Sequence, residues 1–372
     1  MKIFLSEFVC GGGWPDGPLP LSLATEGRAM LLAVAEDLTR VGTLQVVTTW
    51  DHRLPPPSWP AGVEIRIVRG QREEVAVSRE LSRDADFTWV IAPECDDILG
   101  RRISDLEVTE AATLNGSVEA VRLCSDKLLL AEWLADRGIP TPRTMAAART
   151  ASVSASGWSG GTPGEESSLP WPIVVKPRDG AGSQSTFVVS GPGVLPSPLL
   201  GWETVAALMQ AEPWPSGWIV QPFVAGRAIS MAAIVRGQED FDLLPAGEQH
   251  LSSDGRLSYR GGTIPAPGCP TEEVESLVSS VIRTLPGLRG WVGFDLLLPE
   301  APSRPPLLIE INPRLTTSYI GYRALLSENL AGRIVDGGLR GSPPATPLSR
   351  GGNRVEKVRF LPDGVLKSLS DM

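Results

Sequence analysis

Histidine and cysteine are scarce in this chain of 372 residues, and their scarcity limits the chemistry that the sequence can support. The two histidines, His52 and His250, have no ligand-like spacing, so there is little case for a zinc site. The cysteines form no Cys-x-x-Cys pair and lie far apart, which favours reduced thiols in a cytoplasmic protein over a disulfide scaffold. They are Cys10, Cys95, Cys124 and Cys269.

Long apolar runs and an excess of basic residues are also missing. No run approaches the roughly 20 apolar residues that a membrane-spanning helix needs. The opening MKIFLSEFVC has its apolar stretch broken by Glu7, which makes it a poor signal peptide, and a lipid anchor on Cys10 is a remote alternative. The 34 basic and 43 acidic residues give a net charge of −9. We therefore predict no membrane partner and no general nucleic-acid partner, although a local basic pocket is compatible with this charge.

The composition that remains is that of a large globular protein. The 39 glycines and 34 prolines indicate many turns, while a hydrophobic content of 42% excludes wholesale disorder. A chain of this length is predicted to fold into two or three domains.

The first third of the chain alternates between strand and helix patterns. Strand-like apolar runs occur at residues 2–9, 44–49, 63–68 and 87–92, and helical patterns occur at 25–41 and 73–82. This order predicts a doubly wound parallel sheet, whose ligands lie beyond the carboxyl ends of the strands.

Candidate substrate contacts follow two of these strands. A run of three glycines comes after the first strand and lacks the GxGxxG spacing of dinucleotide sites, so it is either a flexible turn or a substrate-contacting loop. Glu94 follows a later strand and, with Asp96 and Asp97, either holds a substrate ammonium group or belongs to an exposed acidic turn. The candidate substrate residues are Glu7, Gly11, Gly12, Gly13 and Glu94.

The middle of the chain contains a Gly- and Ser-rich hairpin. Residues 111–138 are predicted to form two helices, with Ser125 as a cap, and residues 146–170 a mobile surface insertion. Strands at 171–176 and 187–190 enclose the loop, whose backbone N–H groups can contact phosphate oxygens while a lysine supplies counter-charge. By itself such a hairpin is usually only a turn, and it is not a Walker loop, because no GKS or GKT follows.

Three polar residues interrupt two apolar strands between residues 290 and 322. Asp295 lies in the first strand, while Glu310 and Asn312 lie at the end of the second. Side chains two residues apart on a strand point the same way, so Glu310 and Asn312 project together, and an adjacent strand would bring Asp295 beside them. Two carboxylates and an amide oxygen suit Mg²⁺. The alternative is a pair of acids at a strand edge. A helix at 323–335 and, within a Pro- and Gly-rich tail, an apolar return at 355–361 complete the chain.

In this order the motifs resemble the ATP-grasp carboxylate–amine ligases, over about residues 115–333. The matching segments are Ser125-Asp126-Lys127 followed by GIPTP, then KPRDGAGSQS, WIVQPFVAG, GFDLLL and EINPR. The resemblance implies an α/β ATP-grasp fold, in which two lobes clasp ATP, preceded by a Rossmann-like domain. The expected divisions are a Rossmann-like domain at 1–114, an N-terminal lobe at 115–217, a C-terminal lobe with the metal site at 218–341, and a tail at 342–372.

The resemblance also implies roles for individual residues. Lys127 and Lys176 would contact the ATP phosphates, the loop at 180–185 would cover them, and the hinge at 221–224 would lie beside adenine. The implied ATP-binding residues are Lys127, Lys176, Gly180, Gly182, Ser183, Gln221, Pro222, Phe223, Val224 and Ser230. The implied ligands of Mg²⁺ or Mn²⁺ are Asp295, Glu310 and Asn312, and the candidate catalytic residues are Arg314, Lys176 and Arg260.

Two positions depart from the family pattern. Gln221 stands where the family often has an acid, and Ala228 stands where it often has the glutamate that binds the ribose hydroxyls, which leaves Ser230 as a substitute. The arginines are also candidates for gripping a substrate carboxylate. A surface ion pair is the alternative, and it suits Arg260 better than Arg314.

Within the superfamily, SEFVCGGG, IAPE and EINPRLTTSYIGY are similar to tyramine–glutamate ligases, which serve the furan-type C1 carriers of methanogens and have relatives in methylotrophic bacteria. This resemblance implies an amine, tyramine or a tyrosine-like one, attacking the γ-carboxylate of L-glutamate after its activation as an acyl phosphate, with the hairpin loop excluding water. The expected partners are ATP, glutamate and an amine, and an oligomer is compatible. The alternatives are a ligase that adds glutamate to an amino acid or peptide, and a non-catalytic nucleotide-binding regulator.

Overall fold

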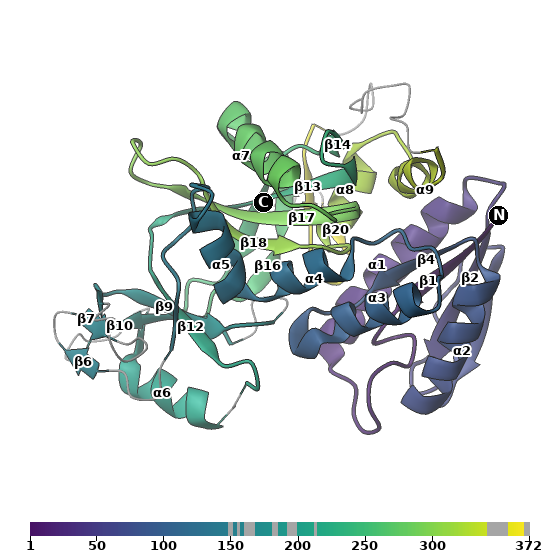
Figure 1. Cartoon of the computed structure of the whole chain (residues 1–372), viewed down its shortest axis with the longest axis horizontal. Helices are drawn as coiled ribbons and strands as arrows, with labels where there is room; N and C mark the ends of the chain where they lie inside the picture. Colours follow the sequence, from purple (N-terminus) through teal and green to yellow (C-terminus); the bar gives the residue numbers. More distant parts are fainter. Residues whose placement is uncertain are drawn as a thin grey trace.

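The computed structural model describes residues 1–147, 152–154, 157–159, 168–180, 185–191, 199–211, 214–340 and 356–367. Its strands form sheets of four, five and eight strands. The four-stranded sheet lies at one end of the molecule, the five-stranded sheet at the other, and the eight-stranded sheet between them (Figure 1). A fourth, three-stranded sheet contains β6 (Ser152–Ser154), β7 (Gly157–Ser159) and β8 (Ser168–Leu169); the rest of the predicted insertion lies largely outside the described residues.

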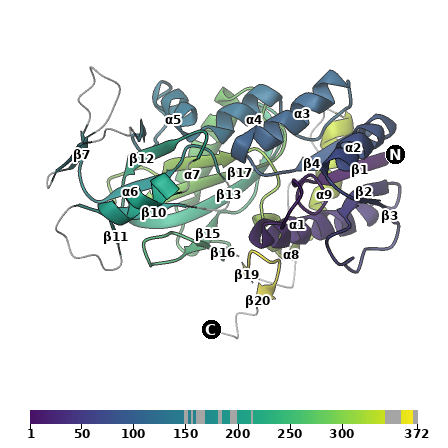
Figure 2. The ribbon, with the colours of Figure 1, turned by 90° about the horizontal axis from the view of Figure 1, so that it is seen from below.

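The four-stranded sheet is parallel, in the order β3-β2-β1-β4. Helix α1 covers one face, while α2 and α3 cover the other (Figure 2), and β1 is buried along nearly its whole length as a result. This arrangement confirms the doubly wound parallel sheet. Its elements are β1 (Lys2–Glu7), α1 (Leu21–Thr39), β2 (Gln45–Asp51), β3 (Val63–Val68), α2 (Gln71–Asp84), β4 (Phe87–Ile91), η1 (Cys95–Asp97) and α3 (Ile98–Val108).

The five-stranded sheet carries the glycine-rich hairpin. Strand β9 lies between β10 and β12 and pairs antiparallel with both, so the two strands of the predicted hairpin are neighbours. The elements of this lobe are β5 (Met145–Ala146), β9 (Ile173–Pro177), β10 (Phe187–Ser190), β11 (Leu200–Gly201), α6 (Trp202–Ala211) and β12 (Trp218–Pro222).

Two short helices, α4 (Val118–Ser125) and α5 (Lys127–Ala135), connect the first sheet to this lobe. The prediction of Ser125 as a cap is wrong. The cap of α5 is Asp126, whose Oδ1 accepts hydrogen bonds from the backbone N–H groups of Leu128 and Leu129, while the Ser125 hydroxyl donates back to the Val121 carbonyl within α4. A carboxylate at this position also favours the helix N-terminus electrostatically.

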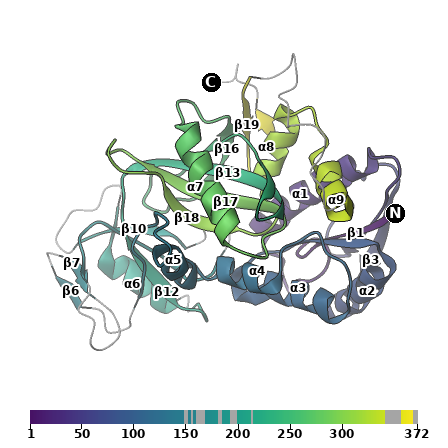
Figure 3. The same ribbon diagram turned by 45° about the horizontal axis from the view of Figure 1, so that its top comes forward.

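The eight-stranded sheet follows the order β18-β17-β13-β15-β16-β19-β20, with β14 on β13. Helix α7 lies across β13 and β17 (Figure 3) and buries one apolar face against them. The strands are β13 (Gly226–Gly237), β14 (Asp240–Leu243), β15 (Gly247–Leu251), β16 (Tyr259–Ile264), β17 (Gly290–Pro299), β18 (Leu307–Asn312), β19 (Val358–Phe360) and β20 (Leu366–Lys367), and the helices are α7 (Thr271–Thr284), α8 (Ser318–Leu325) and α9 (Leu330–Arg340).

The single helix predicted at 323–335 is two helices in the structure. Helix α8 ends before Leu326, which is extended, and α9 begins at Leu330. The side chain of Asn329 accepts a hydrogen bond from the Gly332 N–H at 2.9 Å, so a capping residue restarts the helix. Among the described residues, no helix combines the length and the apolar character that crossing a membrane requires.

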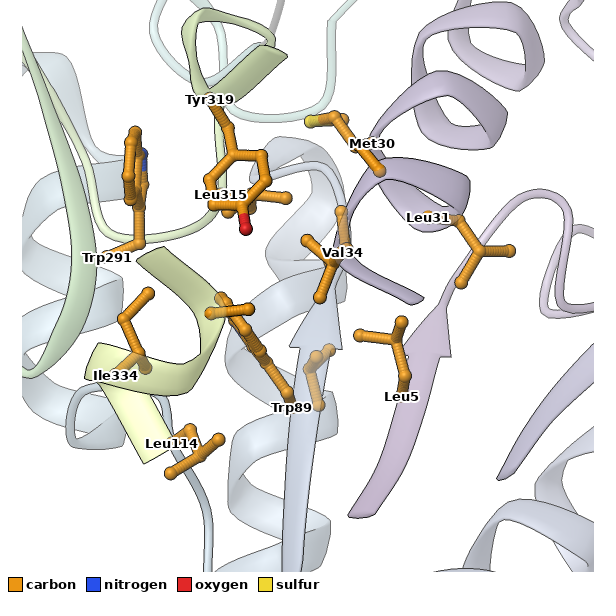
Figure 4. Packing of buried hydrophobic residues seen from close by; sticks show 14 of the residues in the cluster. Leu5, Met30, Leu31, Val34, Trp89, Leu114, Trp291, Leu315, Tyr319 and Ile334 are labelled. Atoms are coloured by element: carbon orange, nitrogen blue, oxygen red, sulfur yellow. The ribbon is translucent and has the colours of Figure 1, made fainter. Parts of the chain in front are cut away.

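One hydrophobic core joins the first sheet to the eight-stranded sheet. Leu5, Val34 and Trp89 from the first sheet and its helix pack in the same cluster as Trp291 and Tyr319 (Figure 4). The Trp291 ring centroid lies 5.1 Å from that of Tyr319 in an edge-on contact. The first sheet is therefore attached to the rest of the molecule by buried apolar surface.

Polar contacts fix helix α1 against the helices after β18. Tyr319 donates a hydrogen bond to Asp37 Oδ2 at 2.6 Å, and Arg323 donates to Asp37 Oδ1 at 2.7 Å. The side-chain amide of Asn329 donates to the Asp37 carbonyl. These bonds set the position of α1, and of every side chain that it presents, relative to β17 and β18.

Candidate functional site

The three polar residues predicted to converge lie side by side on β17 and β18. Asp295 is directly opposite Glu310 and Gly293 is opposite Asn312, with a bulge immediately after Asp295. The side-chain amide of Asn312 donates to Asp295 Oδ2 at 3.1 Å. Antiparallel pairing thus produces the predicted grouping, because residues opposite one another share a face.

A fourth polar side chain, that of Gln249 on β15, joins this group. Its Nε2 donates to Asp295 Oδ1 at 2.8 Å. Burial, with the negative charge of Glu310 adding to it, raises the pKa of Asp295 to about 7. Sequence reasoning missed Gln249, because no motif surrounds it.

Two lysines from different elements reach the same carboxylate. Lys176 on β9 places its Nζ 3.1 Å from Glu310 Oε1, and Lys127 at the start of α5 places its Nζ 3.8 Å from the same atom. Lys127 also donates to the Gly180 carbonyl at 3.0 Å. Burial opposes ionisation of Glu310, but the two ammonium groups hold the pKa of Glu310 below its ordinary value. Burial lowers the pKa of Lys176. The two lysines and the acids therefore belong to one site.

Arg314 lies beside this group and faces Glu94. Its Nε is 2.7 Å from Glu94 Oε2, and Glu94 is only 4% exposed, so the exposed acidic turn offered as an alternative is wrong for this residue. The contact is an ion pair without hydrogen-bond geometry: Arg314 Nε and both Glu94 oxygens are buried and have no hydrogen-bond partner among the described residues. Asp97 instead pairs with Arg122, and the exposed Asp96 accepts nothing at its side chain among the contacts recorded for the described residues.

A cavity opens between helix α1 and strands β13, β15, β17 and β18. The side chains of Asp295, Glu310 and Asn312 line it, and so does that of Glu26 on α1. Its lining residues are Glu26, Ser230, Met231, Gln249, Tyr259, Gly293, Phe294, Asp295, Glu310, Asn312, Arg314, Thr316, Thr317 and Ser318. Glu26, which sequence reasoning also missed, comes from the first domain.

The three glycines after β1 are buried and tightly packed rather than a flexible turn. A methyl group at Gly11 would overlap the Glu7 carbonyl, one at Gly12 would overlap Val68, and one at Gly13 would overlap Phe8. Gly12 also has a φ of +92°, a conformation that favours glycine. None of them lines the cavity described above, so a substrate contact by this loop stays a prediction.

The remaining predicted site residues are spread around the cavity. Ser230 lines it, whereas Arg260 is exposed, as expected for a residue that alternates along β16 with the cavity-lining Tyr259. Gln221 is buried and donates to the Thr144 hydroxyl at 2.8 Å. The chain continues from it towards β13 through Pro222, Phe223 and Val224, and Phe223 is exposed. Gly182 and Ser183 lie outside the described residues.

Glu7 is buried at the end of β1, where its Oε2 accepts a hydrogen bond from the Cys10 N–H at 2.5 Å. Burial raises the pKa of Glu7 to about 7. A folded-state pKa above the unfolded value means that protonated Glu7 stabilises the fold, fully at acidic pH, and that this contribution is lost as the pH rises towards 7 and beyond. We expect Glu7→Gln to increase the free energy of unfolding at pH 8 by about 3 kcal/mol and to change it little at pH 5.

Urea unfolding at pH 5 and pH 8 measures this difference. Glu300→Gln, which removes an acid from an exposed position after β17, is the control and should leave the pH dependence unchanged. Equal pH dependence of stability in the wild type and Glu7→Gln would contradict the assignment.

The donor set of the cluster fits a hard divalent cation. It comprises two carboxylates and an amide oxygen, from Asp295, Glu310 and Asn312, on one face of two paired strands. Within the part of the chain that the structure describes, no group of three or more histidine, cysteine, aspartate or glutamate side chains forms a metal cage. Such a sparse oxygen set suits an ion that keeps waters or substrate phosphates as its other ligands.

The fold and this cluster define a known class of enzyme. A sequence profile described as the ATP-grasp domain matches residues 124–318, and one described as the pre ATP-grasp 3 domain matches residues 44–121. The first match covers more than half of the chain, so the chain belongs to the ATP-grasp family. The chain is an ATP-grasp ligase, and the predicted parallel-sheet domain precedes its ATP-grasp fold.

Similar proteins come from archaea and bacteria. The tyramine–L-glutamate ligase of Methanocaldococcus fervens is 22% identical over 325 residues, which cover 86% of this chain and 89% of that enzyme. The enzyme of the same name from Methanocaldococcus jannaschii is 22% identical over 242 residues, covering 65% of this chain and 60% of that enzyme.

Solved structures show the same fold. An ATP-grasp superfamily protein from Archaeoglobus fulgidus has a TM-score of 0.63 at 22% identity, covering 96% of this chain and 92% of its own. N5-carboxyaminoimidazole synthetase from Staphylococcus aureus, complexed with ADP, has a TM-score of 0.66 at 12% identity, and the match covers 97% of this chain and 81% of that one. ATP-grasp enzymes use ATP and a divalent metal ion.

Proposed function

We propose that this protein is an ATP-dependent ligase that joins the γ-carboxylate of L-glutamate to an amine, tyramine or a tyrosine-like one. One observation supports this most directly: the Nζ atoms of Lys127 and Lys176 both lie within 4 Å of Glu310 Oε1. Glu310 and Arg314 line the same cavity. The relatives named tyramine–L-glutamate ligase support the choice of substrates. On this proposal the product belongs to the biosynthesis of a methanofuran-type C1 carrier.

The two lysines and the arginine supply positive charge for phosphoryl transfer. The γ-carboxylate oxygen of the substrate glutamate attacks the γ-phosphorus of ATP in line, and the bond from that phosphorus to the bridging oxygen breaks, which releases ADP. Lys127, Lys176 and Arg314 stabilise the oxygens on which charge develops. Asp295, Glu310 and Asn312 would hold Mg²⁺ or Mn²⁺, which when bound neutralises phosphate charge. The hinge at 221–224 would lie beside adenine, Ser230 would take the ribose contact, and the loop at 180–185 would lie over the phosphates.

The second step needs no protein nucleophile. The amine attacks the acyl phosphate and inorganic phosphate leaves, so the protein has to orient two substrates and to exclude water. Cys95 is the cysteine whose pKa feels the charge of Arg314, but burial raises the pKa of Cys95 to about 11 and keeps the thiol protonated. A covalent cysteine intermediate is therefore disfavoured near this site.

Each of the expected domains contributes a different part of the proposed site. The domain at 1–114 and the lobe at 218–341 enclose the cavity, the lobe at 115–217 brings Lys127 and Lys176, and the tail at 342–372 returns to pair β19 with β16. The substrates are small molecules, namely ATP, glutamate and the amine.

ADP release tests the proposal. Purified protein with ATP, Mg²⁺ and L-glutamate is combined with a panel of amines that includes tyramine and tyrosine, and the product is identified by mass spectrometry. ADP release that requires both glutamate and an amine from the panel, with formation of the γ-amide, is the expected result. Release only with amino-acid or peptide acceptors would replace the proposed substrates. ATP binding without turnover on any acceptor would replace the ligase by a nucleotide-binding regulator.

A further inference from the structure

We infer that the carboxylate of Glu26 is the counter-ion for a primary ammonium group of a substrate in the cavity between α1 and strands β13, β15, β17 and β18. This inference rests on the proposed function and deepens it, because it names the residue that recognises the amino group. The amino group belongs either to the amino acid that is activated or to the amine that attacks it.

The position of Glu26 places a negative charge at the part of the cavity that the first domain supplies. It lines the cavity together with Arg314, Tyr259 and Ser318. The Asp37 contacts hold α1 against α8 and against the segment before α9, so the backbone that carries Glu26 is fixed relative to the strand that carries Asp295.

The cavity lining contains charged groups of both signs, which act on one another electrostatically. The positive charge of Arg314 acts on both Glu26 and Glu310, and the negative charge of Glu26 acts on the Tyr259 hydroxyl. Lys127 and Lys176 lie beside Glu310. Arg314 lines the same cavity as both acids, with Lys127 and Lys176 beside Glu310 and the Tyr259 side chain in the same lining as Glu26.

Within the described part of the chain, no lysine or arginine forms an ion pair with Glu26. Its recorded hydrogen bond among the described residues comes from the Ser22 hydroxyl at 3.5 Å, the limit of such a bond, and no lysine or arginine of the described residues lies within 4.0 Å of it. It is half-buried, and burial raises its pKa while Arg314 opposes the rise. A partly desolvated carboxylate without a partner is stabilised by an incoming cation.

The neighbouring acids have other interaction partners or belong to the group that suits a metal ion. Glu94 faces Arg314 at 2.7 Å, and Glu7 accepts the backbone N–H of Cys10. Asp295 and Glu310 belong to the cluster that suits a metal ion. Of the described acids that line the cavity, Glu26 is thus the one left for a substrate ammonium group.

Substitution of Glu26 tests this role through the two Michaelis constants. Glu26→Gln should raise the KM of one substrate about 10- to 100-fold and leave kcat within a few-fold of the wild type. Glu26→Asp keeps the negative charge on a side chain shorter by one methylene group. The KM of this variant should lie between those of the wild type and Glu26→Gln. Glu272→Gln removes an exposed acid from the first turn of α7 and is the control that should change neither constant.

The two sources of the ammonium group give different results. If it belongs to the activated amino acid, the KM of L-glutamate rises and the wild-type preference for L-glutamate over glutarate, which lacks the amino group, disappears in Glu26→Gln. If it belongs to the amine, the KM of the amine rises and that preference persists. Values of both constants within twofold of the wild type would overturn the inference.

A binding measurement distinguishes failure of this inference from failure of the proposed function. If the wild type forms no γ-amide with any amine, thermal unfolding with Mg²⁺ and a non-hydrolysable ATP analogue is measured with L-glutamate, glutarate and tyramine. Stabilisation of the wild type by an amino compound, lost in Glu26→Gln, supports the inference. Equal stabilisation of both proteins, or of neither, overturns it.

Discussion

Replacing Glu310 by glutamine is expected to lower kcat by about 100- to 1000-fold while the chain still folds. Glu310 is the acceptor shared by Lys176 and Lys127 and is paired with Asp295 across the strands. Glutamine has the same shape but no charge, so it neither orients the two ammonium groups as strongly nor offers a carboxylate to a divalent ion. The measurement is ADP release at saturating substrates, with circular dichroism to establish folding.

The fold should survive with some loss of stability. The substitution leaves the buried Lys176 without its carboxylate partner, and an unpaired buried charge is costly. Glu300→Gln on the loop after β17 is the matched control, with unchanged kcat and stability. A kcat close to that of the wild type in Glu310→Gln would refute the role of this carboxylate in the reaction.

Lys176→Met should lower kcat/KM for ATP by about 100-fold or more. Methionine fills a similar buried volume but removes the ammonium group that lies 3.1 Å from Glu310 and, on the proposed function, contacts the transferred phosphate. The loss of Lys176 leaves Glu310 with Lys127, at 3.8 Å, as its remaining cation, while the cost of burying the Lys176 ammonium group, which lowers its pKa, is removed, so we expect a moderate loss of stability in the ligand-free protein.

Steady-state kinetics with varied ATP, together with thermal unfolding with and without nucleotide, measure both effects. Lys367→Met changes an exposed lysine of β20 and should behave as the wild type. A large loss of stability with unchanged kcat/KM would show that Lys176 is structural rather than functional.

The sequence carries the part of this site that lies on contiguous strands. Glu310 and Asn312 are two residues apart, so strand periodicity alone puts them on one face, and the apolar run around Asp295 identifies its partner strand. The lysines were placed through the resemblance to a family, since nothing in their local sequence connects Lys127 to Lys176.

The rest depends on contacts between segments far apart in the chain. Glu26 has no motif around it and reaches the cavity only because α1 packs against α8 and α9. Glu94 looked exposed because its neighbours are acidic, and the arginine that faces it is far along the sequence. The restart of the helix at Leu330 was missed because apolar periodicity continues across Asn329, whose capping contact is visible only in the structure.

The apolar cluster shared by the first sheet and the strands of the metal-type site has a consequence for protein engineering. A fragment that lacked the first 114 residues would carry Trp291, Tyr319 and Ile334 on a bare surface. Patches of this kind promote aggregation. The N-terminal region thus cannot be exchanged by itself. A chimera that takes this region from a relative would also need α8 and α9 from the same relative.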